Sequence, residues 1–174
     1  MDAVATYREA PVACCVFRLR SGLLAIDARL VGEVVVIEGL TPLPGCHPAV
    51  LGLANLRGRA MAVVDLGQVL GDGQPATAMA QSLRVLVLRL PGCETGVVVE
   101  RIDGVFIADP ALRRTVNRLT EPAWITAFQG FTPAAGGAPL IAALIDPIEL
   151  AARLEPLRGA PRPTATMPIP LISA

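Results

Sequence analysis

The chain has 174 residues, and its 15 basic and 15 acidic side chains give a formal net charge of zero, which predicts no attraction to nucleic acid or to an anionic membrane. All the basic residues are arginines, so the sequence excludes Schiff-base catalysis, a pyridoxal linkage, a Walker-type phosphate loop and a kinase nucleotide lysine. Charged residues make up only 17% of the chain, against a usual value of about 25%, which favours a protein with an apolar surface that contacts partners.

The sequence also predicts where the protein acts. Arg57 and Arg59 interrupt the longest apolar candidate, residues 49–66, so no membrane-spanning helix is expected. The first residues lack the basic and apolar regions of a signal peptide. We therefore expect a cytoplasmic chain in which the four cysteines, Cys14, Cys15, Cys46 and Cys93, are reduced.

Short strands dominate the predicted secondary structure. Turn residues such as Ser21-Gly22, Pro91-Gly92 and Asp103-Gly104 separate runs rich in Val, Ile and Leu. These runs cover residues 14–19, 23–27, 34–38, 50–56, 60–64, 83–90 and 96–101. Close spacing of short strands favours a barrel or a sandwich over alternating strands and helices.

Helices are expected to be few and short. Asp65 and Asp146 each precede a helical pattern as N-caps, and Gly71 ends the first helix after little more than a turn. The second helix has Pro147 at its first position and is expected to extend to Leu157. A third short helix is expected to start at Asp109-Pro110.

An internal repeat is the clearest long-range pattern. Residues 26–32 resemble residues 98–104, with a shared Arg-aliphatic-x-Gly, and residues 63–66 resemble residues 144–147, each an apolar strand that ends in an Asp cap. Two copies of one unit, the second with an insertion, would explain both matches. Chance similarity among valine-rich strands is the alternative.

Candidate catalytic residues are scarce. His47 is the single histidine and the one candidate base, and its neighbour Cys46 is the nearest candidate nucleophile, although adjacent side chains on an extended segment diverge. No Gly-x-Ser-x-Gly elbow and no Cys-x-x-Cys pair is present. We therefore expect no enzyme, no cofactor and no metal, with a small hydrolase built on His47 and a cysteine as the competing hypothesis.

The segment from Gly52 to Leu66 predicts a β-hairpin with a defined tip. Asn55 can bind its own backbone and Gly58 can adopt a positive φ, so the turn does not depend on the side chain of Arg57. A guanidinium at a rigid turn is suited to bidentate binding of a carboxylate on a partner. A solvated turn arginine is the alternative.

This hairpin, Gly52-x-x-Asn55-Leu56-Arg57-Gly58 followed by Val64-Asp65-Leu66, resembles the signature of CheW-like domains. Residues 25–34 are similar to the family's first hairpin, and residues 96–105 and 140–150 are similar to its second half. The resemblance covers about residues 13–156. Two tails of the chain lie outside the family pattern: residues 1–12 and residues 157–174, a Pro-rich segment expected to be extended or disordered. Residues 167–172 are apolar enough to dock on another surface, but a passive tail is favoured.

The resemblance implies a mainly β fold with two five-stranded barrels of the SH3 type on a shared core, the first over about residues 13–75 and the second over about 83–150. It implies an adaptor between the regulatory domain of a CheA-type histidine kinase and the cytoplasmic tip of a methyl-accepting chemoreceptor, for flagellar chemotaxis or a twitching or other pathway. A polarity or structural scaffold without kinase contact is a further alternative.

By matching position, the resemblance assigns two groups of residues. Partner contacts fall to Val31, Glu33, Gly52 and Arg57, and support of the hairpin falls to Asn55, Gly58 and Asp65. Two further apolar segments, 105–107 and 124–125, are expected in the core, with an interface role as the alternative.

Overall fold

Ten strands and two α-helices make up most of the computed structural model in the part of the chain that it describes, residues 13–20, 22–71, 82–117, 119, 121–132 and 139–158. The strands are β1 (Ala13–Leu19), β2 (Gly22–Asp27), β3 (Val31–Ile37), β4 (Val50–Leu56), β5 (Arg59–Asp65), β6 (Leu83–Leu90), β7 (Cys93–Val98), β8 (Arg101–Thr115), β9 (Ile125–Phe131) and β10 (Leu140–Ile145). The helices are α1 (Leu66–Leu70), α2 (Pro147–Arg158) and a 3₁₀ turn at Ala28–Leu30. The mainly β fold predicted from the sequence is confirmed.

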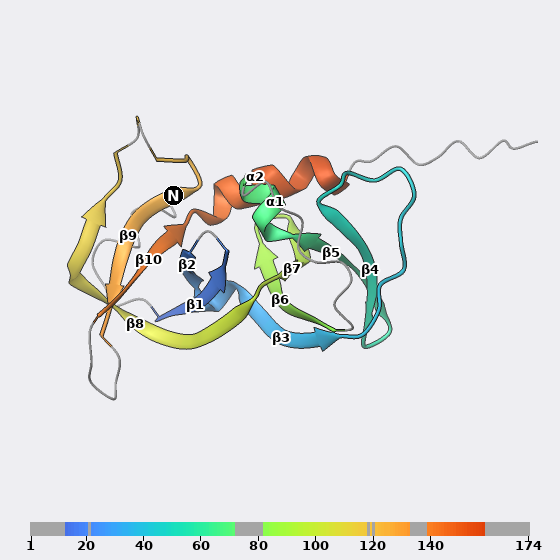
Figure 1. Cartoon of the computed structure of the whole chain (residues 1–174), viewed down its shortest axis with the longest axis horizontal. Helices are drawn as coiled ribbons and strands as arrows, with labels where there is room; N and C mark the ends of the chain where they lie inside the picture. The colour runs from blue at the N-terminus through green and yellow to red at the C-terminus, as the bar shows by residue number, and fades with distance from the viewer. Residues whose placement is uncertain are drawn as a thin grey trace, which may run out of the picture.

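The strands form two lobes that lie side by side (Figure 1). In the barrel lobe, the closed order is β1-β2-β10-β9-β8, and in the open lobe the order is β3-β6-β7-β5-β4. Each lobe therefore takes strands from both halves of the chain. The expected division into a first barrel over about 13–75 and a second over about 83–150 is wrong in this respect, because β1 and β2 pair with β8 and β10 rather than with β3 to β5.

The two lobes repeat one strand order. Read from β8 as β8-β1-β2-β10-β9, the barrel lobe matches β3-β6-β7-β5-β4 element by element. Each lobe also has one parallel pair at the same place, β10 with β2 and β5 with β7. This order supports the internal repeat expected from the sequence, with the two copies exchanging strands.

The lobes differ at one position. In the barrel lobe β8 pairs with β9 and closes the sheet, whereas the equivalent strands β3 and β4 are the two edges of the open lobe. The chain after β3 partly covers this gap, because Thr41 forms an isolated bridge with Leu53, with two backbone hydrogen bonds of 2.9 Å. We call the gap between β3 and β4 the β3–β4 opening.

One apolar core joins the lobes, and each lobe has a smaller interior of its own. The shared core includes Phe17 and Ile26 from the barrel lobe, Leu86 and Leu88 from the open lobe, and Leu150 of α2, which runs across both lobes in Figure 1. Strand β6 therefore buries both of its faces, which explains its nearly continuous apolar sequence. Each fully buried aliphatic side chain contributes about 1.5–3 kcal/mol to stability.

The two predicted helix caps are present. The Asp65 carboxylate accepts a hydrogen bond from the Gln68 amide, and Gly71 ends α1 in the left-handed conformation. The Asp146 carboxylate accepts from the amides of Ile148 and Glu149 at the start of α2. Helix α2 reaches Arg158, so its last turn takes up the first residues of the segment expected to be a tail; the rest of that tail and residues 1–12 lie outside the described residues.

The third helix expected at Asp109-Pro110 is wrong, because these residues lie within β8. The strand leaves β1 after Ile107 and pairs with β9, with a register shift between Ala108 and Arg113. Proline is tolerated at such an irregularity because it has no N–H to donate to a ladder. The buried Gln129 amide holds the irregularity in place by donating to the Asp109 carbonyl at 2.6 Å.

Candidate functional site

The β4–β5 hairpin ends in a two-residue turn at Arg57-Gly58. Both residues have positive φ, 51° and 82°, as in the turns that match the twist of antiparallel strands. Asn55 stabilises the turn, because its side-chain oxygen accepts a hydrogen bond from the Gly58 amide at 2.8 Å. The tip is therefore fixed by backbone geometry, and the Arg57 side chain is 80% exposed.

The exposed guanidinium of Arg57 has a partner within the chain. Its Nη2 donates to Glu33 Oε2 at 2.9 Å. Glu33 lies on β3 opposite Val87, whose side chain belongs to the interior of the open lobe, and the Glu33 side chain is only 23% exposed. The ion pair thus spans the β3–β4 opening. At the equivalent position of the barrel lobe, β8 pairs with β9.

The ion pair between the two side chains was not expected, because the family resemblance assigned both Arg57 and Glu33 to partner contacts. The ion pair is accessible at its arginine end, and an exposed pair of this kind stabilises the fold by less than about 1 kcal/mol. A carboxylate from another protein could therefore bind the outward side of the guanidinium while Glu33 holds its orientation. Glu33 is placed to position Arg57 more than to contact a partner itself.

Gly52 of β4 and Val31 of β3 are the other two residues that the resemblance assigned to partner contacts. Gly52 is buried with φ of 149°, and a Cβ there would lie 2.6 Å from the Thr41 carbonyl oxygen, so the residue permits the close approach of the segment that covers the β3–β4 opening. Val31 is half-buried and packs against the shared core. The structure therefore places Gly52 beneath the surface, where it shapes the opening.

Asp65 lies at the opposite end of the hairpin. Its carboxylate is buried and caps α1, and its amide donates to the Ala49 carbonyl at 2.8 Å. These bonds tie the end of β5 to the segment that precedes β4. Asp65 thus orients the hairpin from its base, at the end of β5 away from the tip.

An exposed apolar rim borders the shared core. Val34 and Val36 of β3 lie opposite Leu86 and Arg84, on the face of the open lobe that packs in the shared core, yet both are exposed. On the barrel lobe, Val105 lies opposite the buried Cys15 and is 63% exposed, and Ile107 is 58% exposed. We call these four residues, Val34, Val36, Val105 and Ile107, the apolar rim.

Two residues of the apolar rim were expected in the core, and the other two were not expected to belong to a site. Val105 and Ile107 were expected in the core, but the core takes Phe106, whose ring lies 6.2 Å from that of Phe131, while Trp124 and Ile125 are buried as expected. Val34 and Val36 were not expected as site residues. Because residues 34–37 of β3 are all apolar, the sequence there does not alternate and does not indicate which face is exposed.

The residues of the hydrolase hypothesis are engaged with backbone groups. His47 Nδ1 accepts from the Ala49 amide at 3.1 Å, and the Cys46 thiol donates to the Val50 carbonyl at 3.5 Å. Burial, followed by the charge of Asp27, raises the pKa of Cys14 to about 12, and burial also raises the pKa of Cys15. Neither buried thiol has the lowered pKa of a reactive cysteine.

Among the residues that the structure describes, no three His, Cys, Asp or Glu side chains gather in a metal-binding arrangement. None of the helices there is both long and apolar enough to cross a membrane.

Comparison with known proteins identifies a family. The model of the CheW-like domain matches residues 13–155. The chain is 33% identical over 103 residues to the chemotaxis protein CheW of Thermotoga maritima, covering 59% of this chain and 62% of the relative, and 32% identical over 89 residues to the protein PilI of Pseudomonas aeruginosa, covering 51% and 49%. The matches thus span less than two thirds of these relatives.

The fold has a counterpart among solved structures. The scaffolding protein TtCheW of Thermoanaerobacter tengcongensis superposes with a TM-score of 0.63 at 22% identity, over 79% of this chain and 90% of that one. At this identity the likeness establishes the fold alone. It agrees with the two five-stranded lobes and the C-terminal helix described above.

Proposed function

Because the chain belongs to the CheW-like domain family, we propose that it is a non-enzymatic adaptor that couples a CheA-type histidine kinase to methyl-accepting chemoreceptors. The proposal extends to its place in the cell, the cytoplasmic side of membrane receptor arrays. It covers flagellar chemotaxis and a twitching or other chemosensory pathway alike. The relative from Thermotoga maritima carries the name of a chemotaxis protein, which supports this role.

The observation that carries the proposal is an exposed guanidinium on a rigid turn. A two-residue turn fixes the backbone of Arg57, and Glu33 fixes the direction of its side chain while leaving it 80% exposed. Little conformational entropy is lost when such a side chain binds, because it is already ordered. The turn is therefore suited to receive a carboxylate from a partner protein.

The apolar rim provides a second contact surface. Exposed valines and isoleucine on two strands at the border of a buried core form the kind of patch at which soluble proteins bind partners. A carboxylate-binding turn and an apolar rim on one chain allow two different proteins to bind together, as an adaptor requires. We assign the turn to the kinase regulatory domain.

The test is a binding experiment with Arg57→Ala. We expect the variant to remain folded and to bind the regulatory domain of the cognate kinase about thirtyfold more weakly, because a charge-assisted interface contact is worth about 2 kcal/mol. Glu33→Gln is the matched variant: it keeps the guanidinium but loses its positioning partner, so a smaller loss is expected.

Two results would count against the proposal. Undiminished binding by Arg57→Ala would remove the turn from the kinase interface. A wild-type chain that binds the receptor fragment but not the kinase would favour a structural scaffold of the same fold. Isothermal titration calorimetry measures both affinities, and circular dichroism confirms that each variant is folded.

A further inference from the structure

One edge of the open lobe has no neighbouring strand in the part of the chain that the structure describes. Strands β3 and β4 are the two edges of this sheet, and Thr41 partly covers β4 by its bridge to Leu53. Among the described residues, no bridge forms on the outer side of β3, where the N–H and C=O groups of alternate residues point away from β6. In the barrel lobe the equivalent strand, β8, pairs with β9. We call the outer side of β3 the free edge.

The free edge is apolar on both faces of its strand. Residues 34–37 are Val-Val-Val-Ile, without a charge or a proline that would prevent pairing. Val34 and Val36 are exposed on one face. Val35 and Ile37 are half-buried on the other face, where they border the interior of the open lobe. Such an edge is a template for a further strand, and a strand that covers it has to be apolar on both of its own faces.

The sequence after α2 contains a segment with these properties. Residues 167–172 are Met-Pro-Ile-Pro-Leu-Ile, apolar at every position. In an extended strand the N–H groups of alternate residues point to the same side. Pro168 and Pro170, which have no N–H, would therefore fall on one side, and the odd-numbered amides from Met167 to Leu171 would fall on the other. A strand of this pattern can pair with one neighbour only, as an edge strand does.

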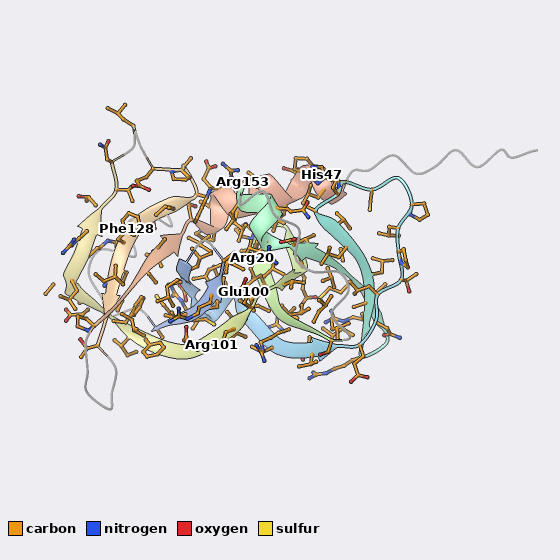
Figure 2. The ribbon with its side chains drawn as sticks, in the orientation of Figure 1. Arg20, His47, Glu100, Arg101, Phe128 and Arg153 are labelled. Atoms are coloured by element: carbon orange, nitrogen blue, oxygen red, sulfur yellow. The ribbon has the colours of Figure 1, made fainter. Side chains whose placement is uncertain are left out.

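The position of α2 allows the segment to reach β3. Leu157, in the last turn of α2, packs against the shared core, to which β6 also contributes. Figure 2 shows Arg153 of α2 and His47 of the connection between β3 and β4 along the upper side of the molecule. Strand β3 pairs with β6 and is thus one strand spacing of about 4.8 Å from it. The nine chain steps from Arg158 to Met167 span up to about 30 Å, which is enough.

We propose that residues 167–172 add to the free edge as a further strand of the open lobe, with their odd-numbered amides donating to β3. The prolines leave the outer side of the added strand without donors at two positions, so the sheet ends there. A segment of the same chain acts at an effective concentration on the order of millimolar, which favours it over β3 of a second copy. The added strand covers Val34 and Val36 of the apolar rim, so a partner that contacts these valines has to displace it.

Hydrogen exchange of the β3 amides, measured by NMR on the full chain at low protein concentration, tests the added strand. Every second amide of residues 31–37, on the side away from β6, is expected to exchange at least about tenfold more slowly in the wild type than in Ile169→Pro. This variant removes a donor from the middle of the paired side and puts a proline ring in its place, while the segment stays apolar.

Ile172→Pro is the matched control. Residue 172 would lie on the same side as the two native prolines, so this variant makes the same change of residue type without removing a donor to β3. The slow exchange of the free-edge amides should therefore remain. An equal loss of protection in Ile169→Pro and Ile172→Pro would refute the alternating pairing on which the proposal depends.

Three other results would also overturn the proposal. Fast exchange of the free-edge amides in the wild type would mean that nothing covers the edge. Protection that persists in Ile169→Pro would mean that another segment covers it. Slow exchange that appears only as the protein concentration rises would identify a second copy as the occupant. Because no partner is present in these measurements, they test the added strand separately from the proposed adaptor function.

Discussion

Gly52→Ala is expected to destabilise the fold by about 3 kcal/mol or more. The φ of 149° is strained for any residue with a Cβ, and that Cβ would lie 2.6 Å from the Thr41 carbonyl oxygen and 3.1 Å from Leu40 Cβ. Backbone strain costs about 1–3 kcal/mol, and overpacking against backbone adds about 1–3 kcal/mol. The segment covering the β3–β4 opening would have to move away from β4.

Gly58→Ala is the matched control for the steric part of this cost. Gly58 also has a positive φ, 82°, but a Cβ there would meet nothing within 4 Å, so only the backbone penalty of about 1–2 kcal/mol is expected. Urea denaturation measures both variants. With a slope of about 2 kcal/mol per molar, Gly52→Ala should lower the midpoint by about 1.5 M, and Gly58→Ala by about 0.5–1 M.

The comparison also tests the role of Gly52. If Gly52→Ala is as stable as Gly58→Ala, the close approach to Thr41 does not constrain the fold and the reasoning is refuted. If it is equally stable but binds a partner less well, Gly52 is a contact residue, as its match to the family motif implied. The structure predicts instead that Gly52→Ala is less stable than Gly58→Ala.

Two further predictions concern stability. Below pH 9 the thiol of Cys14 is protonated in both the folded and the unfolded chain, whereas between pH 9 and about 12 the unfolded chain loses this proton and the folded chain keeps it. The free energy of unfolding should therefore fall as the pH rises through this range. Urea titrations should show a smaller fall for Cys14→Ala. Asp146→Ala should cost about 1 kcal/mol, because the amides of Ile148 and Glu149 lose their acceptor, and thermal denaturation with Asp146→Asn as the control measures it.

Local structure followed closely from the sequence. Apolar runs bounded by Gly, Pro and Asp predicted the first seven strands to within a few residues at each end, and the caps of α1 and α2 were read from Asp65 and Asp146. One exception is Asp109-Pro110, which has the residues of a helix start but lies within β8, and the expected runs included neither β8 nor β9. The buried Gln129 amide, which is distant in sequence, holds the backbone there.

Contacts between distant segments could not be predicted in the same way. The pairing of Arg57 with Glu33 joins the turn after β4 to β3, and these two strands are the opposite edges of the open lobe, 24 positions apart at these residues. The pairing of Arg18 with Asp103 joins residues 85 positions apart and depends on the register of β1 with β8. Periodicity within a strand contains no information on its neighbours in the sheet, so neither ion pair had a local signal in the sequence.

The exchange of strands between the lobes makes a prediction about folding. The half of the chain that ends after α1 contains β1 to β5, and the half that begins before β6 contains β6 to β10, so neither half has all the strands of one lobe. A fragment of either half would expose most of the shared core, which takes Phe17 from one half and Leu86 from the other. Neither fragment should therefore fold alone.

Mixing the two fragments should restore the fold, because the mixture again contains all the strands that pair with one another in each lobe. Each fragment alone should lack cooperative urea unfolding by circular dichroism, whereas an equimolar mixture should unfold with a midpoint that rises with protein concentration, as for any associating pair. Two independent barrels formed in chain order would instead give fragments that each unfold cooperatively without the other. Cooperative unfolding of the first half alone would therefore contradict the strand order on which the β3–β4 opening depends.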